Sequence, residues 1–100
     1  MIIDNNEHIK KTTIKTYYSA VCTFDRQPFD GEITVEFEPK EHYVELIAFG
    51  KELYEITSCG LTTVEEICDK IHQTLLTRGI TAKVIVSCDS KNHPSCVVEK

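Results

Sequence analysis

The segment from Glu32 to Glu38 alternates strictly between apolar and polar residues, and this pattern restricts the fold more than any other feature. Ile33, Val35 and Phe37 fall on one side of an extended chain, and the residues between them are Glu or Thr. Successive side chains of a strand point to opposite faces, so the pattern predicts a strand buried on one face only. Such strands belong to antiparallel sheets whose apolar face is covered by other elements.

The segment from Thr62 to Arg78 is suited to cover that face. Its apolar residues recur at helical spacing, and they are Val64, Ile67, Cys68, Ile71 and Leu75. Thr63 and Glu66 have the spacing of a capping box, in which each side chain satisfies a backbone N–H of the first turn. Gly79 follows the last turn and suits the left-handed conformation that ends many helices. The sequence therefore predicts a helix here.

Three further segments are typical of strands: Thr12 to Cys22, Ile80 to Ser87 and Ser95 to Glu99. Residues 43–56 fit both a strand and a helix, and Gly50 weakens either alternative. The order of elements predicts an α+β fold, an antiparallel sheet with helices on one face.

The chain has 100 residues, which is enough for one compact domain and too few for a nucleotide-binding domain beside a catalytic one. We expect a flexible N-terminus over residues 1–10 and a single domain over residues 11–100. An active site must then be small or shared between copies of the chain.

Charge and cysteine content restrict the partners and the compartment. The net charge of −5 argues against a nucleic acid or an anionic membrane as partner. The first residues do not have the pattern of a signal peptide, so we expect none. The five cysteines show no paired spacing, and we therefore expect free thiols in the cytoplasm.

Cys22 stands at a strand end, just before a turn that holds Asp25 and Asp30. A thiolate there could act as a nucleophile and the carboxylates could move protons. The alternative is that Cys22 is a small buried hydrophobic residue. Glu65 could bind adjacent N–H groups of a heterocycle in a bidentate manner, or it could simply complement the helix dipole.

Cys88, His93 and Cys96 surround one turn, and this set could chelate a soft divalent metal. Structural zinc takes four ligands and catalytic zinc three, and the local set lacks a Cys-x-x-Cys pair. We therefore expect no metal, with this trio as the alternative.

Residues 17–30 resemble the nucleophile segment of the nitrile reductases that reduce 7-cyano-7-deazaguanine in queuosine biosynthesis. That family reads Cys-Pro-x-Thr-Gly-Gln-Pro-Asp there, and Cys22, Gln27 and Pro28 match in register. The following strand, residues 33–39, matches as well. The similarity continues through Val44-Glu45-Leu46 and Phe49 to Glu65, and it covers roughly residues 17 to 75.

The resemblance implies the tunnelling fold (T-fold), a ββααββ unit whose copies form a homo-oligomer with purine or pterin sites between subunits. It implies an NADPH-dependent oxidoreductase in which Cys22 adds to the nitrile as a thioimide and Asp30 supplies protons. It also implies that Glu65 anchors the base and that Glu45 supports the site.

Two departures concern the acid and the histidine of that family. Phe29 stands where the family has its proton-donating aspartate, and Asp30 comes one residue later. A one-residue slip on a strand turns a side chain to the other face, unless a bulge at Gly31 restores it. Val64 stands where the family has a histidine before the anchoring glutamate.

A third departure concerns the cofactor. The family's lysines that hold the NADPH phosphates are replaced by Ile47 and Gly50, and Lys51 is out of register. The sequence thus predicts a small-heterocycle-binding protein of purine or pterin type with a weakened NADPH site. The alternative is a non-catalytic oligomeric or interaction module that kept the scaffold and lost the chemistry.

Overall fold

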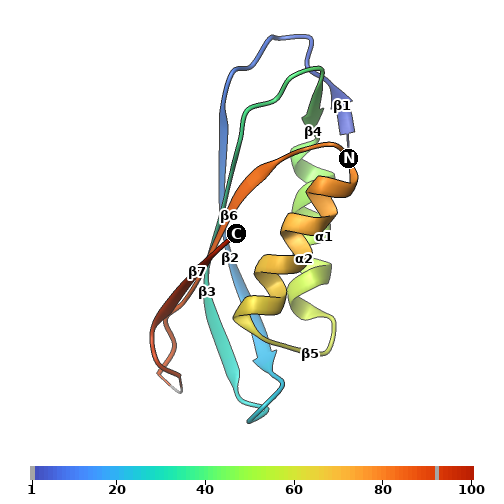
Figure 1. The fold of residues 1–100 in the computed structure, drawn as a ribbon. Coiled ribbons are helices and arrows are strands. Elements are labelled where there is room, and N and C mark those ends of the chain that lie inside the picture. Colours follow the sequence, from blue (N-terminus) through green and yellow to red (C-terminus); the bar gives the residue numbers. More distant parts are fainter. Residues whose placement is uncertain (1, 92) are drawn as a thin grey trace.

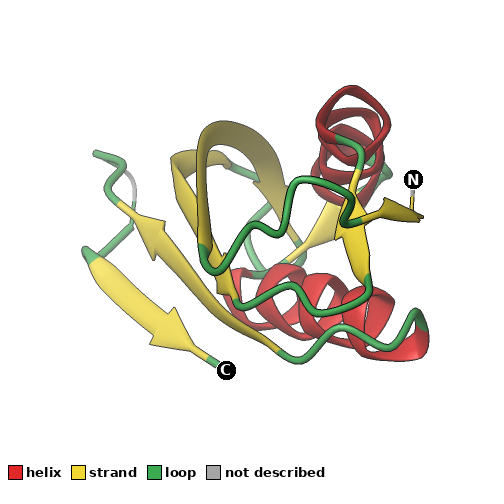
Figure 2. Cartoon of the chain, turned by 90° about the horizontal axis from the view of Figure 1, so that it is seen from above, coloured by secondary structure: helices red, strands yellow, loops and turns green. Residues whose placement is uncertain are grey.

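The computed structural model describes residues 2–91 and 93–100 as two helices packed against one side of a curled sheet, seen from the side in Figure 1 and from above in Figure 2. The elements in chain order are β1 (Ile2–Asp4), β2 (Thr12–Cys22), β3 (Pro28–Phe37), β4 (His42–Val44), α1 (Leu46–Ser58), β5 (Leu61–Thr62), α2 (Val64–Thr77), β6 (Ala82–Cys88) and β7 (Cys96–Glu99). The predicted α+β class is confirmed.

The main sheet has the strand order β5-β2-β3-β6-β7. The pairs β2–β3, β3–β6 and β6–β7 are antiparallel, as predicted. The purely antiparallel sheet is a wrong prediction, because β5 pairs with β2 in parallel. The chain returns from α1 to the edge of β2 and forms two residues of strand there before α2 begins. Such a short strand has no periodicity by which a sequence could reveal it.

The two strongest sequence patterns are confirmed. Ile33, Val35 and Phe37 of β3 are buried, and so is the whole apolar stripe of α2. The hydroxyl of Thr63 accepts a hydrogen bond from the backbone N–H of Glu66 at 3.2 Å. Gly79 has φ +80° and ends α2 in the left-handed conformation.

The ambiguous segment contains both a strand and a helix, β4 followed by α1. The residues at helical spacing that favoured a helix here, Val44, Ile47, Ala48, Lys51 and Tyr54, predict the helix correctly but not its buried face. Phe49, Leu53 and Thr57 are the buried residues of α1, whereas Ile47 and Tyr54 are 72% and 71% exposed. Several apolar residues on opposite sides of this helix made the buried face impossible to choose from the sequence.

The N-terminal segment is attached to the fold through β1, which pairs with β4. The Asn5 side chain also donates to the backbone carbonyls of Ile9 and Lys40, at 3.1 and 3.0 Å. Met1 lies outside the described residues, and the flexibility of residues 1–10 stays a prediction.

The core lies between the sheet and the helices, with α2 packed mainly on β6 and α1 on β2. A bidentate ion pair joins the helices, since the Arg78 guanidinium donates to the Glu52 carboxylate at 2.6 and 2.8 Å. Neither helix is long and apolar enough to cross a membrane, as judged from the described residues.

Candidate functional site

A pocket of about 280 Å³ opens at the end of the molecule drawn lowest in Figure 1, where β2 ends and α2 begins. The start of β3 and the hairpin between β6 and β7 close its other sides. Its lining residues are Cys22, Phe24, Phe29, Thr63, Val64, Glu65, Cys88, His93, Pro94 and Cys96. Four of these positions, Cys22, Phe29, Val64 and Glu65, are ones that the resemblance singles out.

The pairing of β5 with β2 brings Cys22 and Glu65 to the same pocket. Cys22 is the register partner of Thr62, and the backbone N–H of Thr23 donates to the carbonyl of Thr62 at 3.0 Å. Because α2 starts two residues after β5, its first turn is fixed beside the end of β2. Glu65 belongs to that first turn and lines the pocket together with the thiol.

The turn after β2 places a carboxylate beside this thiol. The sulfur of Cys22, a carboxylate oxygen of Asp25 and a ring nitrogen of His93 all lie within 4.8 Å of one another. The backbone N–H of Gln27 donates to Asp25 Oδ1 at 3.0 Å. That bond, above all, lowers the pKa of Asp25, and hydrogen bonds with Cys22 and His93 act in the same direction. Asp25 is therefore an ionised carboxylate with three partners.

His93 reaches this cluster from the β6–β7 hairpin. Its Nε2 lies 3.1 Å from Asp25 Oδ2, and its ring contacts the Phe29 ring at a centroid distance of 5.7 Å. The His93 side chain is only 17% exposed. Its Nδ1 is buried and has no hydrogen-bond partner among the described residues.

The alternative metal trio does not converge in the described part of the chain. Cys88 and Cys96 are register partners across β6 and β7, and both line the pocket with His93. Burial and the neighbouring Cys88 raise the pKa of the Cys96 thiol, which disfavours a metal-binding thiolate there. The side chains that come within ligand distance of one another are instead Cys22, Asp25 and His93. The absence of a bound metal stays a prediction.

Asp30 lies apart from this pocket. The register of β2 and β3 is continuous from Thr12↔Phe37 to Val21↔Pro28, so no bulge occurs at Gly31. Phe29 is therefore buried and lines the pocket, and Asp30 is exposed and lines a different hollow, between the sheet and α1.

Glu45 is the N-cap of α1 and lines none of the described hollows. Its carboxylate accepts from the backbone N–H groups of Ile47 and Ala48, at 3.1 and 2.8 Å. These bonds, that of Ala48 foremost, lower the pKa of Glu45. The sequence pattern Val-Glu-Leu thus has a structural explanation in the start of α1.

Replacing Glu45 by Ala should lower the melting midpoint by a few degrees at neutral pH, because α1 loses its cap. A carboxylate with a lowered folded-state pKa stabilises the fold above its ordinary pKa, near 4, and that contribution is lost as the pH falls. Parent and variant should therefore converge in thermal melts at pH 3. Glu55→Ala, an exposed glutamate of the same helix, is the control. Unchanged stability with lost ligand binding would instead support a binding role for Glu45.

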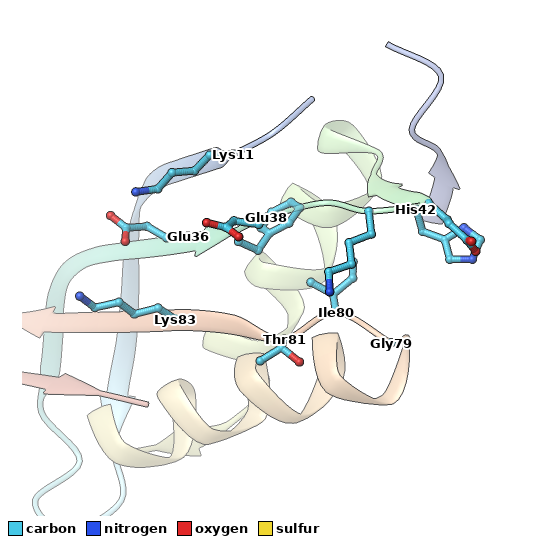
Figure 3. A pocket seen from close by; sticks show the side chains of 11 residues that line it. Lys11, Glu36, Glu38, His42, Gly79, Ile80, Thr81 and Lys83 are labelled. Carbon is cyan, nitrogen blue, oxygen red and sulfur yellow. The ribbon is translucent and has the colours of Figure 1, made fainter. Parts of the chain in front are cut away.

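A third hollow, of about 710 Å³, lies at the opposite end of the molecule and contains none of the predicted site residues. Figure 3 shows Lys11, Glu36 and Lys83 on adjacent extended segments there, with Gly79 at the end of α2. Glu36 and Lys83 are register partners on β3 and β6. Charges of both signs that alternate on neighbouring strands are typical of a solvated sheet surface.

The fold and the pocket define a class, that of small α+β proteins with a thiol and a carboxylate at one end of a curled sheet. A solved structure with this fold is that of the archaeosine synthase QueF-Like in its apo form, a T-fold member of the nitrile reductase family. The two share 18% identity and a TM-score of 0.72, over 90% of this chain and 92% of that chain. The predicted resemblance is confirmed, and at this identity it establishes the fold.

No protein-family model and no curated protein matches the sequence.

Proposed function

We propose that this pocket binds a planar heterocycle of purine or pterin type. The observation that carries the proposal is that Cys22 and Glu65, from distant parts of the sequence, line one pocket. A carboxylate can accept two adjacent ring N–H groups, which is the pattern that a guanine-like edge presents. The volume of about 280 Å³ suits a single bicyclic ring, since pockets for larger ligands occupy roughly 300–1,000 Å³.

Aromatic and apolar groups of the same pocket support a flat ligand. Phe29 is buried at its floor and Val64 lines it from α2, whereas Phe24 is 87% exposed beside it. Offset stacking on such a ring contributes about 1 kcal/mol beyond the area buried. Phe24 is thus placed to cover a ring that Phe29 supports.

We further propose that the thiol of Cys22 forms a covalent bond with a bound heterocycle. A nitrile on the heterocycle, as in 7-cyano-7-deazaguanine, would accept the thiol as a thioimide. The similarity to the archaeosine synthase QueF-Like fold supports this chemistry over unrelated uses of a cysteine.

The residues at the family's cofactor positions do not fit the binding of the NADPH phosphates. Ile47 and Gly50, at the positions of the family's lysines, carry no positive charge. A reductive step is therefore no part of the proposal.

The test is a thermal-shift screen of purines, deazapurines and pterins. A ligand that binds only the native state adds about 2.7 kcal/mol at 100 times its Kd, a rise of several degrees. Glu65→Gln should weaken the binding of any such ligand roughly 10- to 100-fold, because a charged acceptor is lost. Glu66→Gln is the matched control, since Glu66 neighbours Glu65 but does not line the pocket. The absence of any shift across the screen would contradict the proposal.

The non-catalytic oligomeric module remains the second candidate, favoured by exposed apolar side chains in the turn after β2 and on the edge strand β7. Phe24 is 87% exposed, and Val97, on the edge strand β7, is 68% exposed. Such side chains are suited to contact another copy of the chain. This candidate predicts a stable oligomer in light scattering that no heterocycle stabilises.

A further inference from the structure

The carboxylate of Asp25, which is exposed and does not itself line the pocket, contacts two reactive side chains that do, Cys22 and His93. Its Oδ2 lies 3.1 Å and its Oδ1 3.3 Å from Nε2 of His93, and it is also a hydrogen-bond partner of the Cys22 thiol. The three groups come from two places in the sequence, the turn after β2 and the hairpin before β7. A thiol, a carboxylate and an imidazole in contact are the components of a nucleophile with its own proton-transfer groups.

The orientation of this cluster is fixed by its surroundings. The backbone N–H of Gln27 holds Asp25 Oδ1 at 3.0 Å. The backbone N–H of Cys22 donates to the Gln27 carbonyl at 3.0 Å, which closes the turn. The ring of His93 packs edge-on against the Phe29 ring. One face of the cluster is thereby locked, and the other opens into the pocket that Glu65 also lines.

One ring nitrogen of His93, Nδ1, has no hydrogen-bond partner among the described residues. Nε2 is engaged by Asp25, and Nδ1 is buried with no hydrogen-bond partner among residues 2–91 and 93–100. Buried polar atoms are almost always hydrogen-bonded, and a water or a polar group of a bound molecule can supply the partner of this nitrogen. A histidine held at one ring nitrogen by a carboxylate can exchange a proton at the other.

We propose that Asp25 and His93 are the proton-transfer pair for the addition of Cys22 to a nitrile, an inference that rests on the proposed function. The Cys22 sulfur forms a bond to the nitrile carbon, and one π bond of the C≡N group breaks. The thiol proton passes by way of the Asp25 carboxylate to Nε2 of the His93 imidazole, and Nδ1 of the same ring gives its proton to the nitrile nitrogen. The Asp25 carboxylate ends in its starting form, and His93 ends with its proton on the other ring nitrogen. The product is a thioimide, and nothing is oxidised or reduced.

This assignment replaces Asp30 as the acid of the site. Asp30 is exposed in another hollow, whereas the position one residue earlier in the chain, Phe29, lines the pocket without an acidic group. Val64 likewise lines the pocket without a titratable group. His93 supplies an imidazole to the pocket, and Asp25, which does not itself line the pocket, contacts both His93 and the Cys22 thiol.

The experiment measures the rate at which 7-cyano-7-deazaguanine adds to the intact protein, by mass spectrometry. Asp25→Asn and His93→Gln roughly keep the side-chain size, but their amides cannot accept or release a proton at neutral pH. Each should slow the addition by about 100-fold or more. Binding of a deazaguanine without the nitrile should change less than threefold. Asp69→Asn, an exposed carboxylate of α2 paired with Lys100, is the control with the same charge change and should react like the parent.

The outcomes separate this inference from the proposed function. If the parent forms the adduct and both Asp25→Asn and His93→Gln react at the parent's rate, the inference is wrong and the covalent function stands. If Asp30→Asn alone slows the addition, Asp30 is the acid and the inference is again wrong. If the parent forms no adduct, both fail. One equivalent of zinc in the purified protein, lost in both variants, would identify the cluster as a metal site and overturn the inference.

Discussion

Replacing Cys22 by alanine is expected to abolish covalent capture of 7-cyano-7-deazaguanine completely. The adduct requires a sulfur that can reach the nitrile carbon while the heterocycle lies on Glu65, and both groups line the same pocket. An alanine methyl group cannot form the bond, so the mass increase of one ligand should disappear from the intact protein. Non-covalent binding should persist, because the carboxylate and the aromatic side chains remain.

The other thiols provide the controls for this experiment. Cys59 is exposed and lies after α1, away from the pocket, so Cys59→Ala should form the adduct at the parent's rate. Cys96 also lines the pocket and is exposed, but partial desolvation and the neighbouring Cys88 raise its pKa, which disfavours the reactive thiolate. An adduct that persists in Cys22→Ala and maps to Cys96 by peptide sequencing would contradict the assignment of Cys22.

The elements that the sequence predicted correctly are those with strong local patterns. α2 has an apolar stripe, an N-cap threonine and a terminal glycine, and all three point to the same helix. β3 has an alternation that only one register can bury. α1 lacked such agreement, because Ile47 and Tyr54 compete with Phe49 and Leu53 for the buried face. The buried face of α1 is therefore decided by its packing against the sheet and not by its own sequence pattern.

The site was predictable in part for the same reason. Cys22 and Glu65 lie in the segments that resemble the nitrile reductases, so these two positions could be selected without knowledge of the fold. The contact of Asp25 with His93 joins residues 68 positions apart and has no local pattern. The sequence indicated each residue separately, Asp25 as a carboxylate that could move protons and His93 as a metal ligand, but only the packing of the β6–β7 hairpin against the turn after β2 brings them together.

Gly31 has a different role from the bulge that the sequence suggested. A Cβ atom built on Gly31 would lie 1.8 Å from the backbone oxygen of Ser87 and 2.7 Å from its carbonyl carbon. The same oxygen accepts from the Tyr18 hydroxyl at 2.8 Å, and the Ser87 hydroxyl accepts from the backbone N–H of Glu32 at 3.0 Å. The backbone of β6 thus lies directly over Gly31, and hydrogen bonds from Tyr18 on β2 and from Glu32 on β3 hold Ser87 there.

Replacing Gly31 by alanine should therefore destabilise the fold by about 3 kcal/mol, a fall of roughly 10 °C or more in the melting midpoint. The obstructing atoms are backbone, so β6 itself must move, and with it the hairpin that carries Cys88 and His93. Gly50→Ala is the matched control, because a Cβ at Gly50 meets nothing within 4 Å and alanine favours the helix α1 by about 0.5–1 kcal/mol. Thermal melts should show opposite shifts for the two variants. Equal shifts would mean that β3 and β6 do not approach as closely as the structure shows, and the position of His93 beside Asp25 would lose its support.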